Sequence, residues 1–249
     1  LASGGYEVAN SLRFNGTNDS LVRTPSSAGS STINTWSFWV KRSELDSSQT
    51  LYSSEVSSSN VFKIGFTSNT LEILFYVAPA YRFQIKTNRL FRDVSAWYNI
   101  VIIQNAGAGT STDRLQIWVN GVRETSFAIT NFPDADEGAA PINASSVSQN
   151  IGTTGTENFG GYMSEVVHID GTAYAASDFG EFDEDSGIWK PIDVSGLTFG
   201  TNGSYFQFKE TGTSQNSSGI GADTSGEDNH YAVNNLTAID QTTDTPTNN

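Results

Sequence analysis

The chain has 249 residues, of which 37% are hydrophobic and 16% charged, and its 27 acidic against 13 basic residues give a formal net charge of −14. Nucleic-acid binding needs a basic face that neutralises phosphates, and the loose basic stretch 82–92 does not provide one, so we expect no nucleic-acid partner. The chain has no cysteine, which excludes disulfides and thiolate metal sites, and no apolar run approaches the ~18 residues of a membrane span, so we expect no membrane insertion.

The first part of the chain consists of short apolar runs separated by Ser, Gly and Asn, which is typical of β-strands. Stretches 6–14 and 20–22 flank Asn-Gly-Thr-Asn and predict an entry hairpin. Residues 34–42 place Trp36, Phe38 and Val40 on one face, which we assign to the core, and Trp39 on the other. Turn residues such as Ser68-Asn69 separate the further strands that we expect at 50–54, 61–66, 71–77 and 81–86.

Residues 97–121 carry the clearest pattern in the chain. Two β-branched and aromatic runs, 98–104 and 114–119, flank a loop of Gly, Ala, Ser and Thr and predict a β-hairpin. Asn120-Gly121 accepts positive φ, so we expect a second tight turn and a third strand through residue 129.

The remaining residues alternate between long polar segments and short strands. We expect a long loop at 131–147, strands at 148–151 and 160–169, a short helix at 175–179, an acidic turn at 180–191 and a strand pair within 199–209. A Ser/Gly/Asn-rich stretch begins at residue 211, so we divide the chain into a body over 1–210 and an extension over 211–249, which completes the body or links to a neighbour.

Several of these segments resemble laminin-G-like domains of the concanavalin A-like jelly-roll class. The similar segments are SLRFNGTNDSLVRTP, NTWSFWVKR, the hairpin ending in LQIWVNG, and QNIGTTGTENFGGYMSEVVHIDG, which matches the closing strand pair. The resemblance implies an all-β fold: a two-sheet antiparallel β-sandwich with one short helix and a loop-rich C-terminal extension.

The C-terminal third also resembles modules of bacteriophage appendage and tail-fibre proteins, through GYMSEVVHIDG, SDFGEFDEDSGIWKP, GTNGSYFQF, GADTSGEDNHY and DTPTNN. This resemblance implies a non-catalytic structural or adhesion module at a virion surface or in another extracellular setting. Its implied partners are other appendage subunits, copies of itself in a homo-oligomer, and a cell-surface glycan. An extracellular domain of a bacterial surface protein is a further interpretation.

The alternative of another class is a polysaccharide-degrading hydrolase or lyase, because concanavalin-type glycanases place two carboxylates on one strand face. The candidate pairs are Glu165 with Asp170 and Glu181 with Asp183. Glycines flank the second pair and favour a solvated turn, and for His168 we expect a surface or half-buried structural role. We therefore predict no catalytic residues.

Two kinds of ligand site remain. Asp223, Asp228 and Asn229 in DTSGEDN offer the oxygens that Ca²⁺ prefers, although an Asp that caps its own turn explains the same pattern. Sugars dock on aromatic faces beside polar groups, for which we name Tyr162, Trp189 and Asp170. Tyr76, Tyr81 and Phe159 are further candidate exposed aromatics, and the competing interpretation of each aromatic is the core.

Overall fold

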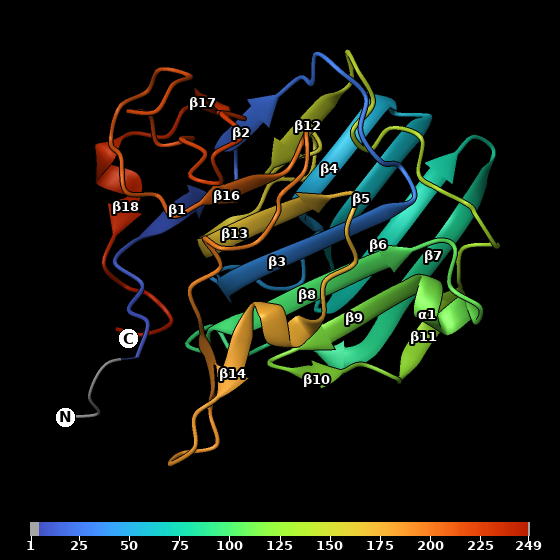
Figure 1. Ribbon diagram of the computed structural model, residues 1–249, viewed down its shortest axis with the longest axis horizontal. Coiled ribbons are helices and arrows are strands. Elements are labelled where there is room, and N and C mark those ends of the chain that lie inside the picture. The colour runs from blue at the N-terminus through green and yellow to red at the C-terminus, as the bar shows by residue number, and fades with distance from the viewer. Residues whose placement is uncertain (1–4, 249) are drawn as a thin grey trace.

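The computed structural model describes residues 5–248 and consists of two large antiparallel sheets packed face to face (Figure 1). In chain order, the first sheet contains β1 (Ser11–Asn15), β3 (Ile33–Arg42), β8 (Tyr98–Asn105), β9 (Leu115–Val119), β10 (Val122–Arg123), β13 (Gly160–Asp170), β16 (Ser204–Phe206) and β18 (Gln241–Thr242). The second sheet contains β2 (Ser20–Arg23), β4 (Gln49–Ser57), β5 (Asn60–Thr67), β6 (Thr70–Val77), β7 (Ala80–Leu90), β11 (Phe127–Asn131), β12 (Ser148–Ile151) and β17 (Ala232–Asn234). The described residues also form a separate hairpin and three single helical turns: β14 (Gly180–Phe182), β15 (Trp189–Pro191), α1 (Ser111–Arg114), η1 (Ala176–Asp178) and η2 (Ala238–Asp240).

This arrangement confirms the predicted all-β sandwich. The strand order is β10-β9-β8-β3-β13-β1-β18 in the first sheet and β11-β7-β6-β5-β4-β12-β2-β17 in the second, and β16 pairs with the second half of β13. The predicted hairpin is present as β8 and β9, which pair from Ile100 opposite Val119 to Gln104 opposite Leu115. Asn120 and Gly121 have φ values of 48° and 73° at the tight turn that follows.

The predicted entry hairpin is wrong, because β1 and β2 belong to different sheets. β1 pairs with β13 and β18, whereas β2 pairs with β12 and β17. The side chain of Asn15 accepts hydrogen bonds from the backbone N–H groups of Thr17 and Asn18, so the turn chemistry expected there is present. The turn carries the chain from one sheet to the other. As a result, Leu12 of β1 and Leu21 of β2 are buried in the shared core from opposite sides.

Three further expectations need correction. The strand expected through residue 129 ends after two residues as β10, and β11 crosses to pair with β7 in the second sheet. The segment 199–209 contains β16 and not a strand pair. The expected closing strands β12 and β13 also lie in different sheets.

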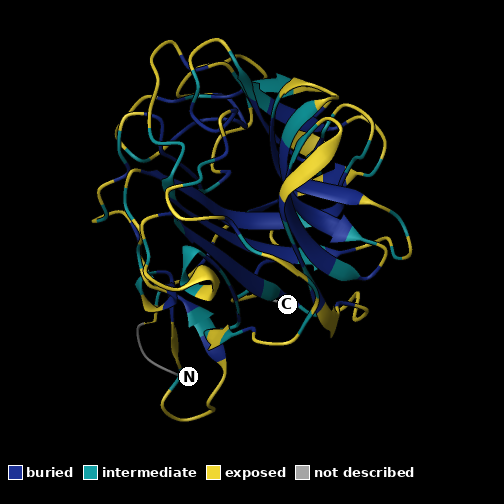
Figure 2. Cartoon of the chain, turned by 90° about the vertical axis from the view of Figure 1, so that its right-hand side faces the viewer, coloured by how far each residue is buried: buried dark blue, intermediate teal, exposed yellow. Residues whose placement is uncertain are grey.

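The main core fills the space between the sheets, and Figure 2 shows the buried strands enclosed by exposed connecting loops. Trp36, Phe38 and Val40 of β3 are at most 1% exposed, which confirms their assignment to the core. Residues of the C-terminal segment belong to the same core, namely Ile220, Tyr231 and Leu236. β17 and β18 add to one edge of each sheet. The end segments also meet, since Val8 and Thr247 form hydrogen bonds through the Thr247 hydroxyl. Residues 1–4 and 249, at the ends of the two predicted units, lie outside the described residues.

A second core lies on the outer face of the first sheet. The segment from residue 171 to 200 covers this face and buries Val101 and Ile103 of β8 together with Val167 and Ile169 of β13. Because both faces of β8 are covered, residues 100–103 form a continuous apolar run and do not alternate with polar residues. On the outer face of the second sheet, Lys63, Tyr76 and Tyr81 line an open groove.

His168 departs from the expected half-buried position, since its side chain is 4% exposed and lies inside the main core. Its ring stacks on Trp36 with 5.1 Å between centroids and an interplanar angle of 1°, and Nε2 lies 3.2 Å from Asn34 Oδ1. Burial lowers the pKa of His168 to about 3, and repulsion from Arg23 acts in the same direction. The imidazole is therefore neutral in the folded chain at neutral pH.

Within the described part of the chain, no helix has the length and apolar composition needed to cross a membrane.

Candidate functional site

The most suitable ligand site is an open groove on the outer face of the second sheet, which we call the tyrosine groove. It has a volume of about 490 Å³ and is lined by residues from β4, β5 and β6, from the start of β7, and from the loop before β13: Glu55, Lys63, Leu74, Tyr76, Tyr81 and Glu157. Strand register explains why they gather, because Ser53 lies opposite Lys63, Lys63 opposite Leu74, and Tyr76 opposite Tyr81.

Two tyrosines form the apolar part of the tyrosine groove. The rings of Tyr76 and Tyr81 have centroids 5.2 Å apart at an angle of 58°, and Tyr81 is 48% exposed. Sugars present flat C–H surfaces that pack on such rings, and their hydroxyls need polar partners at the edges. Lys63, Glu157, Thr154 and Thr156 supply such groups in the same groove.

Of the charged groups in the tyrosine groove, two form an ion pair and one has no charged partner among the described residues. The Nζ atom of Lys63 lies 2.7 Å from Glu157 Oε2, and the Lys63 side chain is only 8% exposed. Burial raises the pKa of Glu55, and among residues 5–248 no hydrogen bond or ion pair reaches its carboxylate. The groove therefore holds one neutralised ion pair and one further carboxylate.

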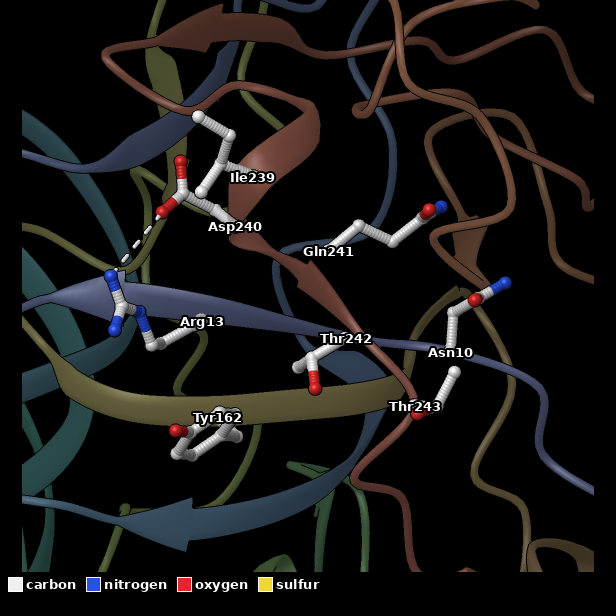
Figure 3. Close-up of a pocket in the computed structure, with 8 residues that line it drawn as sticks. All are labelled: Asn10, Arg13, Tyr162, Ile239, Asp240, Gln241, Thr242 and Thr243. Carbon is white, nitrogen blue, oxygen red and sulfur yellow. Dashed lines mark ion pairs between the residues drawn. The ribbon is translucent and has the colours of Figure 1, made fainter.

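Tyr162, named from the sequence as a sugar-binding residue, lines a different pocket on the outer face of the first sheet (Figure 3). Arg13 and Asp240 form an ion pair of 3.8 Å at its rim, and Thr242 of β18 also lines it. The Lys41 ammonium lies 5.6 Å from the centre of the Tyr162 ring, and Trp97 packs edge-on against the same ring. These neighbours leave Tyr162 less free for stacking than Tyr81.

Trp189 is 8% exposed and packs with Trp39 and Trp97 in a third apolar cluster. Its Nε1 atom donates to Asn99 Oδ1 at 3.0 Å. At Gly121 a Cβ atom would lie 2.3 Å from the Trp189 ring, so only glycine permits this packing. Because its ring is enclosed, the structure gives Trp189 a role in anchoring the β14–β15 hairpin, and the interpretation as a stacking platform does not fit. Phe159 is also buried, at 0% exposure.

Asp170 lies at the end of β13 and is 7% exposed. Its two carboxylate oxygens accept backbone N–H groups of two loops, from Ser30 at 2.7 Å and from Asn202 at 3.0 Å. Both oxygens are occupied by these bonds, so the carboxylate ties the loops to the strand and is not presented to a ligand.

The candidate calcium loop has the geometry of a self-capped turn. The carboxylate of Asp223 accepts backbone N–H groups of Tyr205, Ser225 and Asn229 and the hydroxyl of Ser225. The Asn229 amide donates to the carbonyls of Thr201 and Gly203, while the Asp228 side chain is 91% exposed. Among the described residues, no cluster of three or more His, Asp or Glu side chains is placed to hold a metal ion. The contacts of Asp223 and Asn229 fit the self-capped turn that the sequence offered as the alternative to a calcium site.

The first pair of carboxylates that suggested a glycanase lies apart in the structure. Glu165 and Asp170 lie at positions separated by roughly 15 Å along an extended strand, whereas paired glycanase carboxylates lie about 5–9.5 Å apart. Glu165 lies at a β-bulge with φ of 47°, and its carboxylate accepts the hydroxyls of Tyr205 and Tyr6.

The second candidate pair is on the β14–β15 hairpin. Both Glu181 and Asp183 contact the ammonium of Lys190, at 3.3 and 3.2 Å, and the Glu181 side chain is 59% exposed. This is the solvated acidic turn that the flanking glycines favoured.

The sequence already contained part of the signal for the tyrosine groove. Tyr76 and Tyr81 flank the turn after β6, so a hairpin over this segment places them as cross-strand neighbours. We nevertheless chose Tyr162 and Trp189 over them. Nothing in the sequence pattern identifies Lys63, Glu55 or Glu157, because Glu157 reaches the groove from a loop before β13.

Structural comparison finds related β-sandwiches. A putative carbohydrate binding protein from Bacteroides ovatus ATCC 8483 matches with a TM-score of 0.60 and 14% identity, over 97% of this chain and 62% of its own length. Looser matches are a heptameric SAP-like pentraxin from Limulus polyphemus (TM-score 0.48, 15% identity, 69% of this chain and 80% of that chain) and domains LG4-5 of the mouse laminin alpha1 chain (0.47, 11%, 70% and 48%). At 14% identity, the match to the Bacteroides ovatus protein shows a common fold and no more.

A search of the curated proteins finds no match. The family model described as the concanavalin A-like lectin/glucanases superfamily, laminin-G type, matches residues 15–176, which is well over half of the chain. The match spans strands of both sheets, from the end of β1 through β13. It confirms the resemblance to laminin-G-like domains that the sequence motifs indicated. The chain belongs to the concanavalin A-like lectin/glucanase superfamily.

Proposed function

We propose that this chain is a non-catalytic carbohydrate-binding and adhesion module, and that it binds glycan in the tyrosine groove. The observation that carries the proposal is the pair of adjacent tyrosines, half-buried Tyr76 and exposed Tyr81, beside polar side chains on the outer face of the second sheet. Membership of a superfamily named for lectins and glucanases supports a carbohydrate ligand. Binding over hydrolysis is supported by the separation of Glu165 from Asp170, whose carboxylates already accept hydrogen bonds, and by the ion pairs that hold Glu181 and Asp183 on Lys190.

We further propose that the module is displayed on an extracellular appendage such as a virion fibre, in several copies. The support is the resemblance of the C-terminal third to such modules. Stoichiometric copies in purified particles would agree with this part of the proposal, and a chain found only free in the medium would contradict it.

The binding proposal is tested with a panel of immobilised oligosaccharides and the double variant Tyr76→Ala/Tyr81→Ala. We expect the double variant to lose about fivefold or more in affinity for every glycan that the natural chain binds, since stacking on aromatic rings contributes on the order of 0.5–1.5 kcal/mol per ring. Tyr162→Ala is the matched control, because it removes a tyrosine from the outer face of the other sheet.

The outcomes separate the two pockets. If Tyr162→Ala abolishes binding and the double variant retains it, the ligand lies in the pocket of Figure 3 and the proposed site is wrong. New reducing ends in a polysaccharide incubated with the protein would overturn the non-catalytic part of the proposal.

A further inference from the structure

The tyrosine groove contains three charged side chains, Glu55, Lys63 and Glu157, whose arrangement bears on the charge of its ligand. Lys63 is the one cation that lines it in the described part of the chain, and its ammonium is already held by Glu157 at 2.7 Å. An acidic sugar would compete with Glu157 for this ammonium, and the Lys63 side chain is only 8% exposed.

Glu55 gives the groove its excess charge. It lies on β4 opposite Val61, so its side chain is on the same outer face as Lys63, within the same groove. No cation compensates its carboxylate among residues 5–248, and the raised pKa of Glu55 agrees with a partly desolvated position. At neutral pH the groove therefore carries two carboxylates against one ammonium, on a chain whose formal net charge is −14.

We propose that the tyrosine groove selects glycans by charge: an amine-bearing sugar binds most tightly, its neutral counterpart less tightly, and an acidic sugar most weakly. Stacking on Tyr76 and Tyr81 is common to the three, because it uses the C–H face of the ring. Glu55 supplies the discrimination, since it attracts an ammonium, is indifferent to a neutral substituent, and repels a carboxylate. This inference rests on the proposed function of the same groove.

The test compares three tetrasaccharides: β-1,4-linked glucosamine, the same tetramer fully N-acetylated, and a tetramer of galacturonic acid. Titration calorimetry at low ionic strength should give about fivefold tighter binding of the amine tetramer than of the N-acetylated one, which is the range of a partly exposed charge pair. The uronate tetramer should bind at least fivefold more weakly than the N-acetylated one. Raising the salt concentration should narrow both differences.

Glu55→Gln should bring the amine and N-acetylated tetramers to within about twofold of each other while N-acetylated binding is retained. Glu184→Gln is the matched control, because it removes the same charge from an exposed position in the β14–β15 turn. A preference that falls equally in both variants would reflect the net charge of the chain and would overturn the role of Glu55.

Charge selection by Glu55 and glycan binding in the tyrosine groove are refuted by different results. Tightest binding of the uronate tetramer, or a preference unchanged in Glu55→Gln, overturns the charge selection and leaves glycan binding in place. If none of the three tetrasaccharides binds, or if Tyr76→Ala/Tyr81→Ala leaves binding unaffected, the proposed function is overturned and this inference with it.

Discussion

The buried imidazole of His168 should make the stability of the sandwich depend on pH. The folded chain keeps this ring neutral down to its pKa of about 3, whereas in the unfolded chain the ring has the ordinary histidine pKa of 6.5. Between these two values the unfolded chain binds a proton that the folded chain does not, so unfolding becomes more favourable as the pH falls. The stabilisation is complete above the unfolded pKa and is lost progressively below it.

The size of the effect follows from the two pKa values. Each pH unit in this window changes the free energy of unfolding by about 1.4 kcal/mol per proton. Between pH 7 and pH 5, proton uptake by the unfolded imidazole should lower the free energy of unfolding by about 2 kcal/mol. Solvent does not screen this contribution, because the side chain is 4% exposed and stacked on Trp36.

Urea unfolding of the natural chain and of His168→Gln at pH 7 and pH 5 measures this contribution. The variant should be less stable at pH 7, because it loses the stacking on Trp36, but its stability should fall less on acidification, by about 2 kcal/mol. His230→Gln is the control at the other histidine in the chain. Equal pH slopes in the natural chain and His168→Gln would refute the reasoning, as would a ring that NMR titration shows to be protonated in the folded natural chain at pH 5.

Two further predictions concern the C-terminal segment. EDTA should leave the melting temperature unchanged, and Asp223→Ala should lower the free energy of unfolding by about 2–3 kcal/mol with or without added calcium, because its carboxylate holds several backbone N–H groups; a calcium-dependent rise in the melting temperature would contradict the turn interpretation. Tyr231→Ala should cost about 3–5 kcal/mol in urea unfolding, since its ring is 1% exposed and packs on Phe206 with centroids 4.9 Å apart, whereas a loss below about 1 kcal/mol would mean that the segment contributes little to the main core.

The sequence predicted the strands of the sandwich far better than their partners. Alternation places Trp36 and Phe38 on one face of β3 whatever strand lies beside it, so this part of the prediction depends only on local geometry. The turn at Asn15 forms with the expected hydrogen bonds, but local turn chemistry does not specify which sheet receives β2. Leu21 of β2 is buried in the core that the two sheets share, so its apolar character does not identify its sheet.

The candidate site was harder to predict for a related reason. Whether an aromatic side chain is free to stack depends on which loops cover the outer face of its sheet. Trp189 is enclosed because residues from the segment around it fold over the first sheet, while Tyr81, on the outer face of the second sheet, remains 48% exposed. Which segments cover the outer face of a sheet depends on residues far apart in the sequence. An alternation pattern within one strand does not contain this information.

The meeting of the two end segments has a mechanical consequence. Ser11 of β1 pairs with Thr242 of β18, and Val8 lies hydrogen-bonded to Thr247, so the chain enters and leaves the fold side by side. Tension drawn through the two ends would load these few bonds one after another, as in unzipping, and would not shear the long ladders of β3, β8 and β13. Under such tension the contacts between the two end segments would break first, before the strand pairs of the sandwich are loaded.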